Sequence, residues 1–250
     1  MPVLVVIPAR LGSTRLPHKP LQLLAGEPLI VRVARHVKEM EAADRVVVAT
    51  DAEEVAQALS RVDVEVVFTR PDHVSGTDRV AEVAAGHDFQ RFDVVVNLQG
   101  DEPFMPRAAV IGSIDRVNAG DDVGTAAAPL DPGEADDPAR VKVVCDVHGR
   151  ALYFSRARIP HWRDGGEAPA GTWWQHLGLY AFRRAALERW TKLEPTPLEV
   201  AERLEQLRAL QHGFTIGVAL LDEPAPAGID TPEDLRRAER HWRATQGATT

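Results

Sequence analysis

The cationic side chains best suited to chemistry lie in one short loop near the start of the chain. Arg10, Arg15 and Lys19 fall within the run PARLGSTRLPHKP, directly after an apolar stretch. Three cations in a loop after a strand, with backbone N–H groups beside them, are suited to binding the oxygens of a polyphosphate. The run has neither the glycine spacing of a P-loop nor that of a dinucleotide-binding turn. It predicts an anion site of another type; the alternative is a solvated basic loop.

Two acidic residues far apart in the sequence are candidates to hold a metal ion. Asp101 follows the run NLQG after an apolar stretch, and Asp230 lies in the turn GIDTP. Mg²⁺ binds oxygen ligands and commonly takes one or two protein carboxylates, with water and phosphate oxygens completing its shell. The pair therefore predicts Mg²⁺ as a cofactor. The alternatives are a turn-initiating Asp–Glu–Pro for Asp101 and a helix-proximal turn for Asp230.

Alternating strands and helices are expected to position these loops. The apolar patterns predict strands over 3–8, 45–50, 64–68 and 93–98, with helices over 28–40, 52–59 and 76–85. This alternation predicts an α/β fold with a mostly parallel, doubly wound sheet and helices on both of its faces. Ligands collect at the carboxyl ends of parallel strands, so the loops after 3–8 and 93–98 are expected at that edge.

The pattern changes after about Pro106, where a smaller sheet extension is expected. The predicted elements are strands over 123–129, 141–146, 151–155, 176–182 and 215–220, an exposed loop over 163–172, and helices over 198–210 and 231–241. Thr231 is expected to cap the last helix, with Pro232 in its first turn. Residues 244–250 are expected to form a frayed tail.

Composition excludes several classes of protein. The chain has 250 residues, of which 44% are hydrophobic and 26% charged, as in ordinary soluble proteins. Its net charge of −8 argues against a surface that holds a nucleic acid backbone. The single cysteine, Cys145, has no partner for an internal disulfide, and no leader pattern or long apolar run occurs. We expect a cytoplasmic protein that binds no nucleic acid and does not insert into membranes.

Eight motifs spread along the chain together resemble one enzyme family. They are PARLGSTRLPHKPL, VVATD (47–51), SGTDR (75–79), NLQGDEP (97–103), LYFSRARIP (152–160), HLGLYAFR (176–183), LEQLR (204–208) and GIDTPEDL (228–235). Over roughly residues 3–240 the chain resembles the 3-deoxy-manno-octulosonate cytidylyltransferase family, also called CMP-KDO synthetase. It departs from that pattern at Leu11 and Gly12, where the family often has Tyr–Ala, and at His18, where it often has Gly. These positions lie between the cations and leave them in place.

The resemblance implies a fold, a reaction and an assembly. The implied fold is the nucleotide-diphospho-sugar transferase-like, Rossmann-like α/β fold. The implied reaction transfers CMP from CTP to 3-deoxy-D-manno-octulosonate (KDO) and releases pyrophosphate, for lipopolysaccharide-type glycan synthesis. The implied assembly is a homodimer. We expect a single domain over 1–250, with a nucleotide-binding half to about 122 and a sugar-binding and dimerisation part over about 123–240.

The resemblance also implies roles for individual residues. Those implied in catalysis are Arg10, Lys19, Asp101 and Asp230, of which Asp101 and Asp230 would hold Mg²⁺. Those implied in nucleotide binding are Arg10, Arg15, Lys19, Ser75, Thr77, Arg79 and Asp101. Those implied in sugar binding are Gln99, Arg156, His176, Tyr180, Glu205 and Gln206. On a strand of period two, His176 and Tyr180 share one face, which suits a common pocket.

Other interpretations of the same residues stay open. Residues 75–79 also fit a helix cap with ordinary surface charges, and His176 taken alone fits a packed histidine. The sugar-facing residues do not separate KDO from another acidic sugar, such as an amino-substituted KDO. A non-catalytic nucleotide-binding module would share the fold, although binding alone does not require both Asp101 and Asp230. A dinucleotide-dependent oxidoreductase is disfavoured because the glycine fingerprint is missing.

Overall fold

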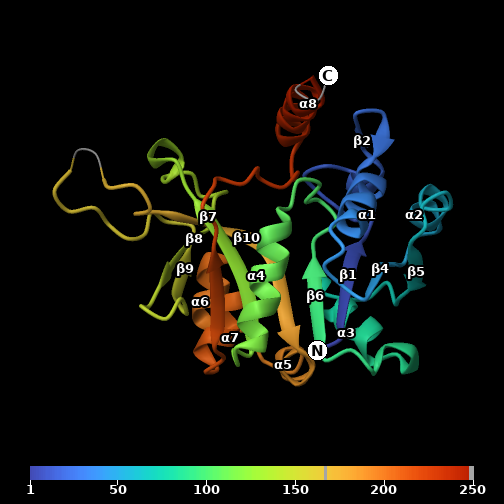
Figure 1. Cartoon of the computed structure of the whole chain (residues 1–250), viewed down its shortest axis with the longest axis horizontal. Helices are drawn as coiled ribbons and strands as arrows, with labels where there is room; N and C mark the ends of the chain where they lie inside the picture. Colours follow the sequence, from blue (N-terminus) through green and yellow to red (C-terminus); the bar gives the residue numbers. More distant parts are fainter. Residues whose placement is uncertain (166–167, 248–250) are drawn as a thin grey trace. The chain divides into compact units, whose positions relative to one another are not determined.

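The computed structural model describes residues 1–165 and 168–247. It has the expected α/β fold, with a mostly parallel central sheet and a small antiparallel one (Figure 1). Contacts within the chain define two units. The first unit comprises 2–92, 97–105 and the segment from Pro226 onwards, and the second comprises 93–96, 106–225 and Met1. No helix of the described residues is both long and apolar enough to cross a membrane.

The first unit is built on parallel strands that are connected by helices. Its strands β1, β4 and β5 pair in that order, and Ala9 lies opposite Thr50, so β1 and β4 end level with each other. Almost every residue of β1 is buried, as the continuous apolar run predicts. The elements are β1 (Val3–Ala9), β2 (Leu23–Leu24), β3 (Glu27–Pro28), α1 (Leu29–Glu39), β4 (Arg45–Thr50), α2 (Glu53–Ala58), β5 (Glu65–Phe68) and α3 (Gly76–Ala85), with short 3₁₀ turns at Lys19–Leu21 and His87–Phe89.

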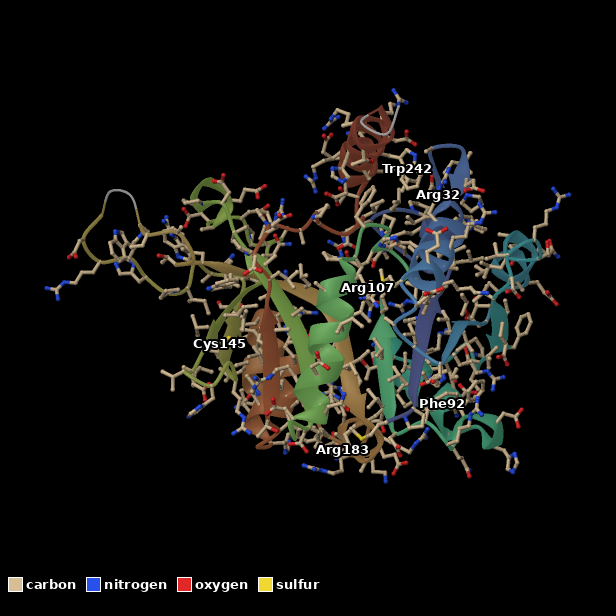
Figure 2. All side chains as sticks on the ribbon, in the orientation of Figure 1. Arg32, Phe92, Arg107, Cys145, Arg183 and Trp242 are labelled. Atoms are coloured by element: carbon tan, nitrogen blue, oxygen red, sulfur yellow. The ribbon has the colours of Figure 1, made fainter. Side chains whose placement is uncertain are left out.

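The C-terminal helix α8 (Pro232–Gly247) belongs to the first unit. Its Trp242 lies under the guanidinium of Arg32, 4.2 Å from the ring centroid, and both side chains are labelled in Figure 2. The capping predicted for Thr231 is confirmed, because its hydroxyl accepts a hydrogen bond from the Asp234 backbone N–H at 3.2 Å. Residues 244–247, which belong to the stretch expected to fray, continue the helix. Residues 248–250 lie outside the described part.

The second unit carries the shorter strands. Strand β7 pairs with β11 in parallel and with β10 antiparallel, while β8 pairs with β10 and β9. Strand β6 (Val94–Leu98) contributes its first three residues to this unit and its last two to the first unit. The other elements are α4 (Arg107–Asn118), β7 (Val123–Pro129), a 3₁₀ turn (Pro132–Glu134), β8 (Lys142–Cys145), β9 (Ala151–Ser155), β10 (Trp174–Arg183), α5 (Arg184–Trp190), α6 (Pro197–Glu202), α7 (Gln206–Gln211) and β11 (Ile216–Leu220).

Three features of the helices differ from expectation. Helices α4 and α5 were not predicted, although Ala109, Val110, Ile114 and Val117 of α4 follow helical spacing and are buried. The single helix expected over 198–210 is two helices. Arg203 separates them with a left-handed backbone, φ 54°, which a continuous helix does not allow. As a result Glu205 and Gln206 lie at the start of α7 instead of inside a longer helix.

Candidate active site

A cavity of about 270 Å³ lies in the first unit, between the loop after β1 and the loop after β6. It forms where strands end, as the rule for parallel sheets predicts. The N-terminus of α3 and the turn before α8 complete its wall. The predicted residues that line it are Arg10, Arg15, Lys19, Ser75, Arg79, Gln99, Asp101 and Asp230. The structure therefore brings together residues that are more than two hundred positions apart in sequence.

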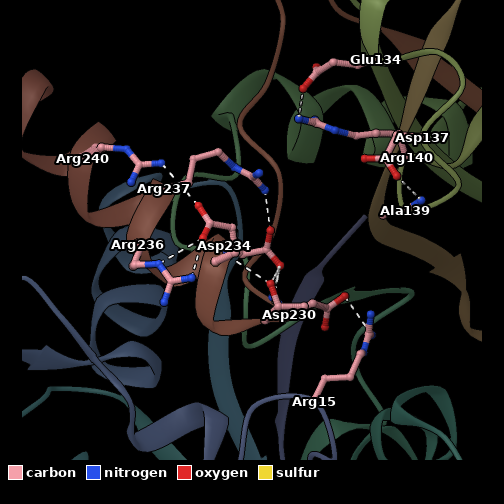
Figure 3. A network of polar contacts seen from close by, with 12 residues as sticks. Arg15, Glu134, Asp137, Ala139, Arg140, Asp230, Asp234, Arg236, Arg237 and Arg240 are labelled. Carbon is pink, nitrogen blue, oxygen red and sulfur yellow. Dashed lines mark hydrogen bonds and ion pairs between the residues drawn. The ribbon is translucent and has the colours of Figure 1, made fainter.

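Lys19 lies between the two candidate metal ligands. Its Nζ donates to Asp101 Oδ2 and, over 2.8 Å, to Asp230 Oδ1. Arg15 approaches the other oxygen of Asp230 at 3.0 Å (Figure 3). Burial acts to lower the pKa of Lys19, but the attraction and hydrogen bonds of Asp101, and then those of Asp230, outweigh it and raise the pKa. The ammonium therefore stays charged and holds both carboxylates towards one point.

Backbone contacts fix the positions of both carboxylates. The Ile229 N–H donates to the Asp101 carbonyl oxygen at 2.9 Å, which ties the turn before α8 to the loop after β6. The Asp230 N–H donates to the Asp234 carboxylate at 3.1 Å, as part of the helix cap (Figure 3). These contacts explain how two acidic residues so distant in sequence both contact the Lys19 ammonium.

Gly100 allows the two loops to approach each other. A β-carbon at this position would lie 2.9 Å from the carbonyl oxygen of Pro8, closer than a side-chain carbon approaches backbone. Glycine is therefore required where the chain passes β1 and continues to Asp101. The motif NLQGDEP contains this signal, but its spacing alone does not show which backbone Gly100 meets.

The start of α3 combines a helix cap with one wall of the cavity. Ser75 Oγ accepts a hydrogen bond from the Asp78 N–H at 3.2 Å, and the Asp78 carboxylate accepts from the Ser75 N–H at 3.1 Å, which makes a capping box. The capping interpretation of this segment is thus observed, and Ser75 also lines the cavity. Thr77 is buried within α3 and is not among the described lining residues.

Arg79 is a buried cation in the same wall. Only 2% of the residue is exposed, and its guanidinium contacts Thr69 Oγ1 and, at 3.2 Å, Asp51 Oδ1. These partners come from the ends of β5 and β4, so Arg79 links three elements at the strand ends. A neighbouring lining residue, His73, was not predicted; its Nε2 hydrogen-bonds the Glu82 carboxylate. The sequence feature that could have indicated His73 is the Asp–His pair shortly before the motif SGTDR.

The residues present fit a magnesium ion. Asp101 and Asp230 already converge on one cation, the Lys19 ammonium, so their oxygens point towards a shared position. Among the described residues, no group of three or more His, Cys, Asp or Glu side chains is arranged to hold a metal. An ion here would therefore use two protein carboxylates and take its other oxygens from water and phosphate, as Mg²⁺ commonly does.

A second cluster of predicted residues lies in the second unit. The rings of His176 and Tyr180 lie 5.4 Å apart, centroid to centroid. Glu205 accepts a hydrogen bond from Trp190 Nε1 at 2.8 Å, and Gln206, next in sequence, is 4% exposed. Burial lowers the pKa of His176 to about 3. Burial, with a contribution from the Glu205 charge, raises the pKa of Tyr180 well above its ordinary value. His176 and Tyr180 are therefore both uncharged at pH 7, beside the Glu205 carboxylate.

Arg156, predicted to face the sugar, makes contacts with backbone carbonyl groups. Its guanidinium donates to the carbonyl oxygens of Glu202 at 2.8 Å and Pro138 at 2.9 Å, and to that of Arg203 at 3.4 Å. These bonds attach the end of β9 to the end of α6 and leave part of its donor capacity for a ligand. Gln99, the remaining predicted sugar residue, lies in the first unit and lines the cavity there.

Comparison with known proteins matches almost the whole chain. The family model described as cytidylyltransferase matches residues 4–216. The 3-deoxy-manno-octulosonate cytidylyltransferase of Gemmatimonas aurantiaca is 53% identical over 100% of this chain and 98% of its own length. The protein with the same name from Halorhodospira halophila is 47% identical over 97% of each chain.

Solved structures agree with these sequence matches. The structure of CMP:2-keto-3-deoxy-manno-octonic acid synthetase in complex with CTP superposes with a TM-score of 0.89. It is 36% identical, covering 98% of this chain and 100% of that one. A 4-diphosphocytidyl-2C-methyl-D-erythritol synthase from Anaerococcus prevotii is 13% identical, with a TM-score of 0.64, and shares the fold alone.

Proposed function

The chain belongs to the 3-deoxy-manno-octulosonate cytidylyltransferase family, and we propose that it transfers CMP from CTP to KDO and releases pyrophosphate. The product would be CMP-KDO, for lipopolysaccharide-type glycan synthesis. The observation that carries the proposal is the convergence of Asp101 and Asp230 on Lys19, inside a cavity whose wall includes the cationic loop. Such a site combines what a triphosphate and a divalent cation need.

In the proposed reaction, the anomeric hydroxyl of KDO attacks the α-phosphorus of CTP. The bond between the α-phosphorus and the bridging oxygen breaks, pyrophosphate leaves with that oxygen, and the hydroxyl proton passes to solvent. Stabilisation of charge dominates a step of this kind. Arg10 and Lys19 bind the triphosphate and offset the charge that develops on pyrophosphate. Arg15, with 64% of its side chain exposed, is a weaker helper.

Asp101 and Asp230 are the proposed ligands of Mg²⁺. They would hold the ion where it would polarise the attacking hydroxyl and lower its pKa, so that no side-chain base would be obligatory. Lys19 prepares the pair for this task, because it keeps two like charges close together before any ligand arrives. Ser75, Thr77 and Arg79 are proposed to hold the ribose and cytosine, on the wall that Ser75 and Arg79 share.

The sugar is proposed to contact Gln99, Arg156, His176, Tyr180, Glu205 and Gln206. KDO carries one carboxylate and several hydroxyls, so its site needs a guanidinium together with neutral hydrogen-bonding groups. Arg156 supplies the guanidinium. His176 and Tyr180 supply neutral polar atoms, since burial keeps both side chains uncharged at pH 7.

The test is pyrophosphate release measured over a matrix of four nucleoside triphosphates and several acidic sugars. We expect release only with CTP, with KDO preferred to its amino-substituted analogue, and only when Mg²⁺ is present. Preference for the amino-substituted sugar would leave the proposed reaction type unchanged but show that the natural sugar substrate is not KDO. Tight CTP binding without pyrophosphate release for any sugar would contradict the proposal and indicate a nucleotide-binding module.

We also propose a cytoplasmic homodimer. The second unit has exposed apolar side chains, including Val147 at 96% and Leu152 at 63%, which supports a partner surface there. The lone Cys145 fits a protein that works without disulfides. Light scattering at micromolar concentration should give twice the mass of the 27.4 kDa chain, and a monomer would contradict the dimer.

A further inference from the structure

Strand β10 has an irregularity at the candidate sugar residues. Leu177 pairs with Ala126 of β7, but the next regular pair joins Ala181 to Gly124. Three residues of β10 therefore lie opposite one residue of β7, which is Thr125. A bulge of this kind bends a strand and redirects its side chains, and bulges are common beside active sites. Tyr180 is one of these three residues, and its ring lies 5.4 Å from that of His176.

Thr125 makes the hydrogen bonds that fill this bulge. The residue is fully buried, and its Oγ1 donates to the Leu179 carbonyl oxygen at 2.7 Å. The Leu177 carbonyl oxygen lies 3.4 Å from the same Oγ1. The same Oγ1 lies 2.9 Å from Nε2 of His176. One hydroxyl thus joins the irregular backbone of β10 to the imidazole that precedes it.

The chemistry of a hydroxyl decides which nitrogen of His176 carries the proton. A threonine hydroxyl has one proton and two lone pairs. Its proton is used by the Leu179 carbonyl, because a carbonyl oxygen accepts only. Oγ1 therefore meets Nε2 with a lone pair, and Nε2 must be the donor. In a neutral imidazole, a proton on Nε2 leaves Nδ1 with a lone pair.

We propose that Thr125 is a positioning residue, which fixes His176 as the Nε2–H tautomer so that Nδ1 accepts a hydrogen bond from a hydroxyl of the sugar. The part that concerns the sugar rests on the proposed function. Neutral His176 is required for this role, because an imidazolium would donate from both nitrogens. The Phe154 ring meets the His176 ring edge to face at 4.9 Å, and the Tyr180 ring is tilted against it at 5.4 Å, so two aromatic contacts also restrict the imidazole.

The test compares two substitutions of Thr125. Thr125→Val keeps the branched shape and removes the acceptor, whereas Thr125→Ser keeps the hydroxyl. We expect the valine variant to raise the KM for KDO about five- to tenfold, which is the effect of losing one hydrogen bond. The KM for CTP should be unchanged. The serine variant should restore most of the KM for KDO. Nitrogen-15 NMR of labelled histidine should show the Nε2–H tautomer in wild type and serine variant, and its loss in the valine variant.

A matched control separates positioning from simple packing. Thr215 is a second threonine of the second unit whose Oγ1 bonds a neighbouring residue, here Asp122, without touching His176. Thr215→Val should lower stability without changing the tautomer or the KM for KDO. The signal of His176 among the nine histidines is identified by its disappearance in His176→Gln.

Two results would overturn the proposal. One is an unchanged Nε2–H tautomer in Thr125→Val; the other is a changed tautomer with an unchanged KM for KDO. Failure of the proposed function is distinguishable from both, because wild-type protein would then release no pyrophosphate with KDO, while the NMR measurement would still test the role of Thr125.

Discussion

The two clusters of candidate residues are built on opposite electrostatic principles. In the first unit, the cavity gathers charges of both signs: Lys19 lies between Asp101 and Asp230, and Arg15 reaches Asp230 from a largely exposed position. In the second unit, His176 is buried and Tyr180 is partly buried, and desolvation shifts both pKa values towards the uncharged form. The first cluster suits a triphosphate and a metal, and the second suits hydroxyl groups.

The difference shows where each cluster is vulnerable. A charged site works through balance, so removal of one charge leaves its partner uncompensated in a partly buried place. A neutral site works through the direction of hydrogen bonds, so removal of one atom changes which partner donates. We therefore expect large changes in rate from the first unit, and smaller changes in affinity and pH response from the second.

The largest effect is expected from the pair Asp101 and Asp230. Asp101→Asn should lower kcat about 10²- to 10³-fold, because one of the two carboxylates that would hold the metal is lost. Adding Asp230→Asn should lower kcat little further, as expected for groups that act as a unit. The measurement is a double-mutant cycle on kcat at saturating Mg²⁺.

CTP affinity, measured by calorimetry, is the control for that cycle. Both variants should still bind CTP, since Arg10 and Lys19 remain. Losses in kcat that simply multiply, or full activity of Asp230→Asn, would show that the two carboxylates do not serve one ion. The assignment of Asp230 as a ligand of that ion would then be wrong.

Lys19 is expected to matter more than Arg15, although both contact Asp230. Lys19→Ala should lower kcat/KM for CTP about 10- to 100-fold, the range for a hydrogen bond to a charged group, through a higher KM and a lower kcat. Arg15→Ala should have a smaller effect, because 64% of the Arg15 side chain is exposed against 17% for Lys19. Steady-state kinetics with unfolding curves checks both. Wild-type kinetics for Lys19→Ala would show that Lys19 does not bind the triphosphate.

His176 should make stability depend on pH. Its pKa is about 3 in the folded protein and about 6.5 in the unfolded chain, so the unfolded chain binds the extra proton first. Stability should be complete above pH 6.5 and fall towards pH 3, by on the order of 1 kcal/mol per pH unit below about 6. Urea unfolding at several pH values measures this, and His176→Gln should reduce the slope.

His87 provides the matched control for that experiment. Its side chain is 96% exposed, so His87→Gln should leave the pH dependence as in wild type. An equal slope in wild type and His176→Gln would show that His176 is accessible to protons in the folded protein. The neutral character of the second cluster would then be wrong.

Much of the first unit follows from the sequence, for a physical reason. Apolar runs such as 3–8 and 45–50 predict buried parallel strands, and the strand-end rule then places their loops at one edge. The convergence of Asp101 and Asp230 on Lys19 did not follow, because it depends on the Ile229 N–H that reaches the Asp101 carbonyl. Contacts between distant backbone segments leave no local pattern.

The second unit followed less completely. Period two predicts a shared face for His176 and Tyr180, and their rings do lie together, but through a bulge opposite Thr125 that no pattern showed. The break at Arg203 was missed because arginine is a good helix former, and its left-handed backbone depends on tertiary contacts. The carbonyl partners of Arg156 were missed because they too depend on tertiary contacts.

The smallest effect is expected from Cys145, the lone cysteine, labelled in Figure 2. Burial, with the nearby Asp146 charge, raises the pKa of its thiol to about 11. Desolvation also keeps His176 uncharged. It raises the pKa of the thiol because the uncharged form of a thiol is the protonated one. At pH 7.5 a disulfide reagent should therefore react about 100-fold more slowly with folded than with urea-unfolded protein, because the thiolate is the reactive species. Cys145→Ser should leave kcat/KM for both substrates unchanged. Reaction of the folded protein at the rate of a free thiol would show that burial does not suppress charge in this part of the second unit, and the contrast with the charged cavity would then be confined to His176 and its neighbours.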